Sequence, residues 1–133
     1  MEKKAKILLV DDDVDFVEST KTVLESKPYE VIVAYQGEEG LRKARQENPD
    51  LVLLDVIMPV KDGFTAAEQF KKDPKLSKIP IIMLTSFSAR GAGTGIPRSR
   101  GAALEVDDYV EKPINPQELL RKVETYLKPR TRG

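Results

Sequence analysis

Five short apolar runs recur along the chain, and each is continuous instead of alternating with polar residues. They occupy residues 7–10, 31–34, 51–54, 81–84 and 109–110. Short continuous apolar runs are typical of strands that are buried on both faces, as in a parallel sheet covered by helices. The pattern therefore predicts five strands of a parallel sheet.

Stretches with helical spacing of apolar residues separate the runs. The last stretch has the clearest start, because Asn115 stands where an N-cap is expected, with Pro116 at the first helical position and Glu118 at the third. Strands that alternate with helices indicate βαβ units, with helices on both faces of a doubly wound sheet. The residues with helical spacing are Phe16, Thr20, Val23 and Leu24, then Gly37, Leu41 and Ala44, then Phe64, Ala67 and Phe70, and finally Leu119, Leu120, Val123, Tyr126 and Leu127.

One segment, residues 88–101, breaks this alternation where the fourth helix is expected. It contains four glycines and one proline, which would together cost roughly 7 kcal/mol inside a helix. We therefore expect an irregular segment, followed by at most a shortened helix near residues 99–105. Arg90, Arg98 and Arg100 either contact an acidic partner or an anion, or belong to a tolerated insertion, and the sequence favours neither alternative.

The composition narrows the chemistry that the chain can perform. The chain has 133 residues with no His and no Cys, which excludes disulfides, thiolate metal sites and catalysis by imidazole. Lys and Arg number 22, as do Asp and Glu, so net charge gives no general attraction to nucleic acid or membrane. No apolar run approaches the roughly 20 residues of a membrane span, and we expect no signal peptide before the first run. We expect one cytoplasmic domain over residues 1–128, with a basic tail over residues 129–133.

Acidic residues follow two of the predicted strands directly. Asp11, Asp12 and Asp13 come after the first strand, and Asp55 comes after the third. If the strand order is 2-1-3-4-5, the first and third strands are neighbours at the point where the order reverses, so Asp11, Asp12 and Asp55 converge there. Carboxylates this close repel one another unless a cation joins them. A hard cation that prefers oxygen ligands fits this set, with Mg²⁺ as our first choice and Mn²⁺ as the alternative.

Thr85 and Lys112 follow the fourth and fifth runs and should reach the same edge of the sheet. A hydroxyl can donate a hydrogen bond to a phosphoryl oxygen, and an ammonium can offset its charge. With a metal site and a carboxylate, these groups suit phosphoryl transfer, which depends on positioning and charge neutralisation. Taken singly, each residue has a plainer interpretation. An acidic run after a strand is usually a solvated turn or a helix N-cap, and we expect Asp13 to be a cap.

Four motifs in order resemble the receiver domain of two-component response regulators, with a likeness to the chemotaxis regulators. The motifs occupy residues 7–13, 53–59 with 62–63, 80–86 and 108–113, within a resemblance that covers about residues 5–128. The resemblance implies a flavodoxin-like fold, with a doubly wound five-stranded parallel sheet in the order 2-1-3-4-5.

The resemblance also implies how the acidic cluster works. Asp55 matches the phosphoacceptor, which takes a phosphoryl group from a phosphohistidine. Asp11 and Asp12 match the acidic pair that holds Mg²⁺ together with Asp55, and the backbone carbonyl of Ile57 completes the protein ligands.

Further matches concern the switch that follows phosphorylation. Thr85 matches the hydroxyl that moves toward the aspartyl phosphate, and Lys112 matches the lysine of the family. The resemblance implies a cis bond between Lys112 and Pro113. Tyr109 matches the aromatic residue whose rotamer is coupled to the threonine. Its plainer interpretation is a half-buried strand tyrosine, which we rank second.

Two apolar residues depart from what many relatives carry. Ile57 lies two residues after the phosphoacceptor, and Phe87 lies two residues after Thr85. In the family these positions flank the path of the water that hydrolyses the phosphate. We therefore predict slow loss of phosphate from Asp55.

The leading hypothesis is a signalling switch that assists its own phosphorylation, not a turnover enzyme. Without His, the chain must receive its phosphoryl group from a sensor histidine kinase or a phosphotransfer protein. We expect an unidentified downstream protein partner, no direct binding to nucleic acid or membrane, and a monomer or weak dimer.

Two alternatives stay open. The first is a Mg²⁺-dependent phosphohydrolase of the haloacid-dehalogenase type that uses Asp11 and Asp13, although it would give Asp55 no role and leave no room for a cap domain. The second is a receiver-like interaction domain that works without phosphorylation.

Overall fold

The structure is a computed structural model, and it describes residues 5–55, 63–86 and 108–127. The described part contains a five-stranded sheet in the order β2-β1-β3-β4-β5, and every pair of neighbouring strands is parallel. This confirms the predicted doubly wound sheet and its order. The strands are β1 (Ala5–Val10), β2 (Tyr29–Ala34), β3 (Leu51–Asp55), β4 (Ile81–Ser86) and β5 (Asp108–Lys112).

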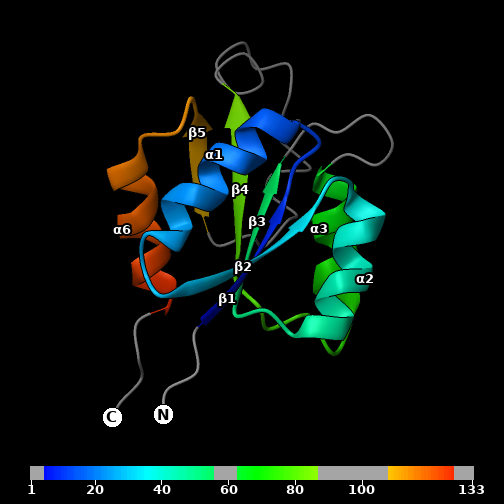
Figure 1. The fold of residues 1–133 in the computed structure, drawn as a ribbon. Helices are drawn as coiled ribbons and strands as arrows, with labels where there is room; N and C mark the ends of the chain where they lie inside the picture. Colours follow the sequence, from blue (N-terminus) through cyan, green and yellow to red (C-terminus); the bar gives the residue numbers. More distant parts are fainter. Residues whose placement is uncertain (1–4, 56–62, 87–107, 128–133) are drawn as a thin grey trace, which may run out of the picture.

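Helices cover both faces of the sheet (Figure 1). Helices α1 and α6 lie on one face, and helices α2 and α3 lie on the other. In the described ranges the helices are α1 (Val14–Glu25), α2 (Gly37–Glu47), α3 (Gly63–Lys72) and α6 (Pro116–Leu127). The expected irregular or shortened fourth helix falls in residues 87–107, and the tail falls in residues 128–133. Both lie outside the described residues and stay predictions.

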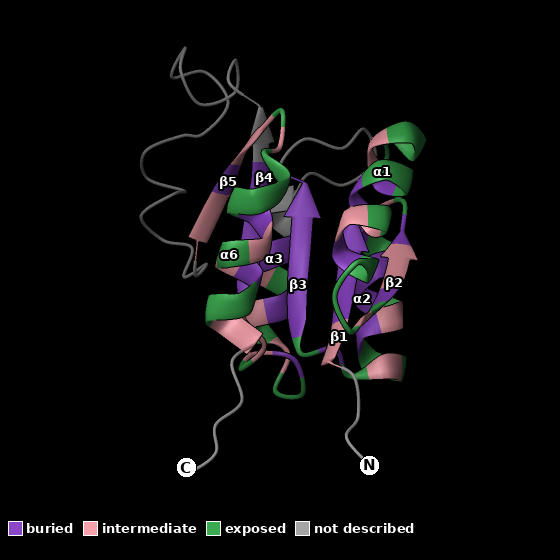
Figure 2. Ribbon diagram, turned by 60° about the vertical axis from the view of Figure 1, so that its left-hand side comes forward, coloured by how far each residue is buried: buried purple, intermediate pink, exposed green. Residues whose placement is uncertain are grey.

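Each strand sends alternate side chains into two separate cores. On β1, Leu8 and Val10 join the core under α2 and α3, whereas Ile7 and Leu9 join the core under α1 and α6. Strand β3 is buried along its whole length (Figure 2). Burial on both faces explains why the runs in the sequence are continuously apolar.

Polar side chains fix the starts of two helices. The backbone N–H of Phe16 donates to Asp13 Oδ1 at 3.1 Å, so Asp13 caps α1 as expected. Asn115 Oδ1 accepts hydrogen bonds from the backbone N–H groups of Gln117 and Glu118 at 3.0 and 3.1 Å. Helix α6 therefore begins at Pro116, directly after its predicted cap.

Candidate functional site

The acidic residues meet because β1 and β3 are neighbours that end together. Val10 pairs with Leu54, so Asp11 and Asp55 come next to each other at the carboxyl ends of these strands. Carboxylate oxygens of Asp11, Asp12 and Asp55 all lie within 4.8 Å of one another. Asp11 and Asp55 are buried, whereas Asp12 is exposed. The predicted convergence of the three side chains is confirmed.

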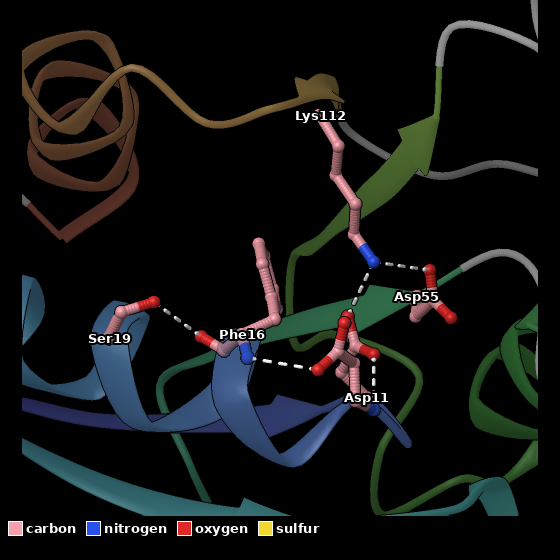
Figure 3. A network of polar contacts seen from close by, with 6 residues as sticks. Asp11, Phe16, Ser19, Asp55 and Lys112 are labelled. Carbon is pink, nitrogen blue, oxygen red and sulfur yellow. Dashed lines mark hydrogen bonds and ion pairs between the residues drawn. The ribbon is translucent and has the colours of Figure 1, made fainter.

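Lys112 reaches this cluster from the end of β5 (Figure 3). Its Nζ lies 2.8 Å from Asp11 Oδ2 and 3.2 Å from Asp55 Oδ1, so one ammonium joins the two buried carboxylates. The Lys112 side chain is 22% exposed, which keeps much of the water away from both ion pairs. The peptide bond between Lys112 and Pro113 is cis, the isomer that the resemblance implies.

Local hydrogen bonds hold Asp11 in place. The backbone N–H of Asp13 donates to Asp11 Oδ1 at 3.0 Å, while Oδ2 accepts from Lys112. The backbone N–H of Asp11 itself donates to the carbonyl of Ala34 on β2 at 3.1 Å. Both carboxylate oxygens and the main chain of Asp11 are therefore engaged, and its position follows from the sheet and the start of α1.

Burial and crowding shift the titration of the site. The pKa of Asp55 is raised to about 6, mainly by burial and next by the charge of Asp11, with Lys112 opposing both effects. Burial also raises the pKa of Asp11, against the hydrogen bond from Lys112. For Lys112, burial alone would lower the pKa, but the two carboxylates outweigh burial and raise it. The cluster thus favours a charged lysine.

The donor set suits a divalent cation. Among the residues that the structure describes, three carboxylates face one ammonium, so this cluster keeps an excess of negative charge when fully ionised. Its ligand atoms are all oxygen, which Mg²⁺ prefers. These ligand atoms lie within 4.8 Å of one another, which is close to the roughly 4.2 Å between opposite ligands of Mg²⁺. The exposed Asp12 opens the cluster to solvent.

Phe16 also belongs to this site, which sequence reasoning missed. The Lys112 Nζ lies over the Phe16 ring, 4.3 Å from its centroid (Figure 3). Helical spacing assigned Phe16 only to the apolar face of a helix. The signal in the sequence was an aromatic residue one turn after the acidic run, but its contact with a residue from the distant β5 depends on the tertiary fold.

The other predicted residues are placed only in part. Thr85 lies in β4, where it pairs with Glu111, but its side chain is outside the described part. Tyr109 lies in β5 and packs partly buried against the core under α2 and α3, and burial raises its pKa. Ile57, Phe87, Arg90, Arg98 and Arg100 lie outside the described residues.

Among the helices of the described ranges, none has the length and the apolar character that a membrane span needs.

Sequence comparison gives this geometry a family context. The family model for the response regulator receiver domain matches residues 7–124. The chain is 39% identical over 128 residues to the probable transcriptional regulator ycf27 of Guillardia theta. The match covers 96% of this chain and 47% of that protein, so the chain spans about half the length of this relative.

Solved structures agree with the match. A putative response regulator from Chloroflexus aurantiacus J-10-fl aligns with a TM-score of 0.84 at 34% identity, covering 96% of this chain and all of that one. The receiver domain of sensor histidine kinase PA1611 from Pseudomonas aeruginosa PAO1 aligns with a TM-score of 0.81 at 27% identity, covering 93% of this chain and 98% of that one. The latter structure has a magnesium ion coordinated in its active site cleft. The fold, the acidic cluster and the family match together show that this chain belongs to the response regulator receiver domains of two-component systems.

Proposed function

We propose that Asp55 accepts a phosphoryl group from a phosphohistidine on a sensor histidine kinase or a phosphotransfer protein, and that the chain then changes its binding to a downstream protein. The observation that carries this proposal is the Lys112 ammonium, which joins buried Asp55 to buried Asp11 within a cluster of three carboxylates. A structural ion pair would need one carboxylate, whereas phosphoryl transfer needs a nucleophile, a cation site and a fixed positive charge together.

Asp55 is the nucleophile in this reaction. Its oxygen forms a bond to phosphorus as the bond between phosphorus and the imidazole nitrogen breaks. Because burial raises its pKa to about 6, the carboxyl is still largely ionised at neutral pH. Lys112, whose pKa is raised, stays protonated and can donate to a phosphoryl oxygen.

Asp11, Asp12 and Asp55 would hold Mg²⁺, with the backbone carbonyl of Ile57 as a further ligand. When bound, the cation neutralises charge on the phosphoryl oxygens. Asp11 contributes from a fixed position because the Asp13 N–H and Lys112 hold both of its oxygens. Asp12 is exposed and can turn toward the cation.

Phosphorylation would then bias a two-state equilibrium. The new phosphoryl oxygens compete for the Lys112 ammonium, which now contacts Asp11 and Asp55. Thr85 would approach the same oxygens, and Tyr109 would respond to its movement. Strand pairing supports such coupling, because β4 carries Thr85 and its neighbour β5 carries both Tyr109 and Lys112.

The phosphohydrolase alternative would use Asp11 as nucleophile and Asp13 as acid. Asp11 is fully buried, and both of its oxygens are engaged. Asp13 caps α1. In this alternative Asp55, which is buried and contacts Lys112, would have no role, so we favour Asp55 as the nucleophile.

Incubation with acetyl phosphate and Mg²⁺, followed by intact-mass measurement, tests the proposal. The wild type should gain one phosphoryl group, and Asp55→Asn should gain none. Asp15→Asn is the matched control, because Asp15 is an exposed acid of the first turn of α1 and lies outside the cluster. Addition of EDTA should stop the reaction. A full gain of mass in Asp55→Asn would contradict the proposal.

A further inference from the structure

The Lys112 ammonium has a third neighbour besides the two carboxylates. The Phe16 ring lies under it, with 4.3 Å between Nζ and the ring centroid. Phe16 comes from the first turn of α1 and Lys112 from the end of β5, so the contact joins two elements that are far apart in the sequence (Figure 3). The role proposed for Lys112 does not by itself require this ring.

The position of Phe16 is fixed independently of Lys112. Its backbone N–H donates to Asp13 Oδ1 at 3.1 Å, and its carbonyl accepts from Ser19 Oγ at 3.2 Å. The side chain is half-buried and packs against the core under α1 and α6. These contacts place the ring beside the acidic cluster without any contribution from Lys112 itself.

The ring supplies something that an aliphatic residue would not. An ammonium is attracted to the negative face of an aromatic ring, and more strongly where water is excluded. Lys112 directs hydrogen bonds at Asp11 and Asp55, and the Phe16 face contacts the same ammonium. A leucine would fill similar space but would carry no such charge distribution.

We propose that Phe16 is a positioning residue for phosphoryl transfer. It holds the Lys112 ammonium between Asp11 and Asp55, so that the positive charge is already in place when negative charge develops on the transferring group. This inference rests on the proposed function of Asp55 and Lys112. It adds the reason why a long, flexible side chain keeps one position.

The test compares the rate constant for phosphorylation of Asp55 by acetyl phosphate at saturating Mg²⁺. Phe16→Leu should be about three- to tenfold slower than the wild type, and Phe16→Tyr, which keeps the ring face, should stay within about twofold. Site-specific replacement of Phe16 by trifluorophenylalanine keeps the shape but weakens the negative face, so it should slow the reaction as leucine does. Tyr29→Leu is the matched control, because Tyr29 is another aromatic residue packed against the same core.

A second readout does not depend on phosphorylation. The ring current of Phe16 should shift the ε-methylene proton resonances of Lys112 upfield, with their assignment made by Lys112→Arg. The shift should persist in Phe16→Tyr and vanish in Phe16→Leu. A wild type without this shift would overturn the inference.

The kinetic outcomes separate the inference from the proposed function. If the wild type gains no phosphoryl group, the proposed function fails and the inference fails with it. If the wild type is phosphorylated and Phe16→Leu is equally fast, the inference alone is wrong. A trifluorophenylalanine variant as fast as the wild type would also overturn it, and this variant decides the matter if the leucine variant does not fold.

Discussion

At Asp55, burial in the fold disfavours the charged carboxylate that the proposed function needs. Its carboxyl is buried beside the buried Asp11, and burial raises its pKa to about 6. A raised pKa means that the native fold disfavours the charged form, so the ionised side chain costs stability. In the proposed phosphoryl transfer, the same shift would make this carboxylate a more basic nucleophile than an exposed one. Lys112 limits the cost because its ammonium contacts both carboxylates.

Asp55→Asn should therefore stabilise the metal-free protein at neutral pH. As the pH rises from about 4 to about 6, the unfolded carboxyl ionises before the native one, so the contribution of Asp55 to stability falls over this range. Above pH 6 the variant should gain about 1–3 kcal/mol in the free energy of unfolding, and below pH 4 it should gain little. Urea unfolding across this pH range measures the difference. Saturating Mg²⁺ should reduce the gain, and a variant less stable than the wild type at pH 7.5 in EDTA would contradict this account.

The contact between α2 and β1 shows how an element positions the site. A Cβ atom built on Gly40 would lie 2.8 Å from Val10 Cγ2, closer than real contacts allow. Val10 is fully buried and directly precedes Asp11. The absence of a side chain at Gly40 thus lets α2 pack closely on the strand that carries the acidic cluster.

Gly40→Ala should lower the free energy of unfolding by about 1 kcal/mol. The better helix propensity of alanine, worth about 1 kcal/mol, is outweighed by overpacking against Val10, which typically costs about 1–3 kcal/mol. In a Val10→Ala background the same substitution should cost less, because the clashing methyl groups are gone. Denaturant unfolding of the four proteins in this double-mutant cycle gives the coupling. Stabilisation by Gly40→Ala in the wild-type background would contradict the close contact.

The helices and strands differ in how far the sequence predicts them. The strands were predictable because burial on both faces leaves a continuous apolar run, as in β3. The polar ends of the strands were not predicted. Strand β5 extends to Asp108 and Lys112, which pair with Ile82 and Ser86 through the backbone, and backbone pairing needs no apolar side chain. Helix α6 was predicted to its first residue because its N-cap signal is local.

At the scale of the whole molecule, the residues of the candidate site that stand at the carboxyl ends of parallel strands could be predicted from the sequence. Asp11, Asp12 and Asp55 converge because β1 and β3 are neighbours, as the order 2-1-3-4-5 considered for a doubly wound sheet requires. The contact of Phe16 with Lys112 joins residues far apart in the sequence, and a phenylalanine or a lysine by itself does not predict such a contact. It needed the three-dimensional packing of α1 against the end of β5.

Mg²⁺ should stabilise the whole fold through the acidic cluster. At ten times its dissociation constant, the cation should add about 1.4 kcal/mol to the free energy of unfolding. Asp12→Asn should lose most of this gain while keeping the buried contacts of Asp11 and Asp55. Thermal unfolding with Mg²⁺ and with EDTA measures the effect, and Asp15→Asn should respond as the wild type does. An equal response in Asp12→Asn would argue against this cation site.

The central claim is that the phosphoryl group is carried by Asp55 as an acyl phosphate. After phosphorylation by a phosphohistidine donor, borohydride reduction converts a phosphoaspartyl residue to homoserine, and peptide mass spectrometry then locates it. We predict homoserine at position 55 in the wild type and at no position in Asp55→Asn. Homoserine at position 11, 12 or 13, or phosphate that survives reduction on a Ser or Thr hydroxyl, would contradict the account.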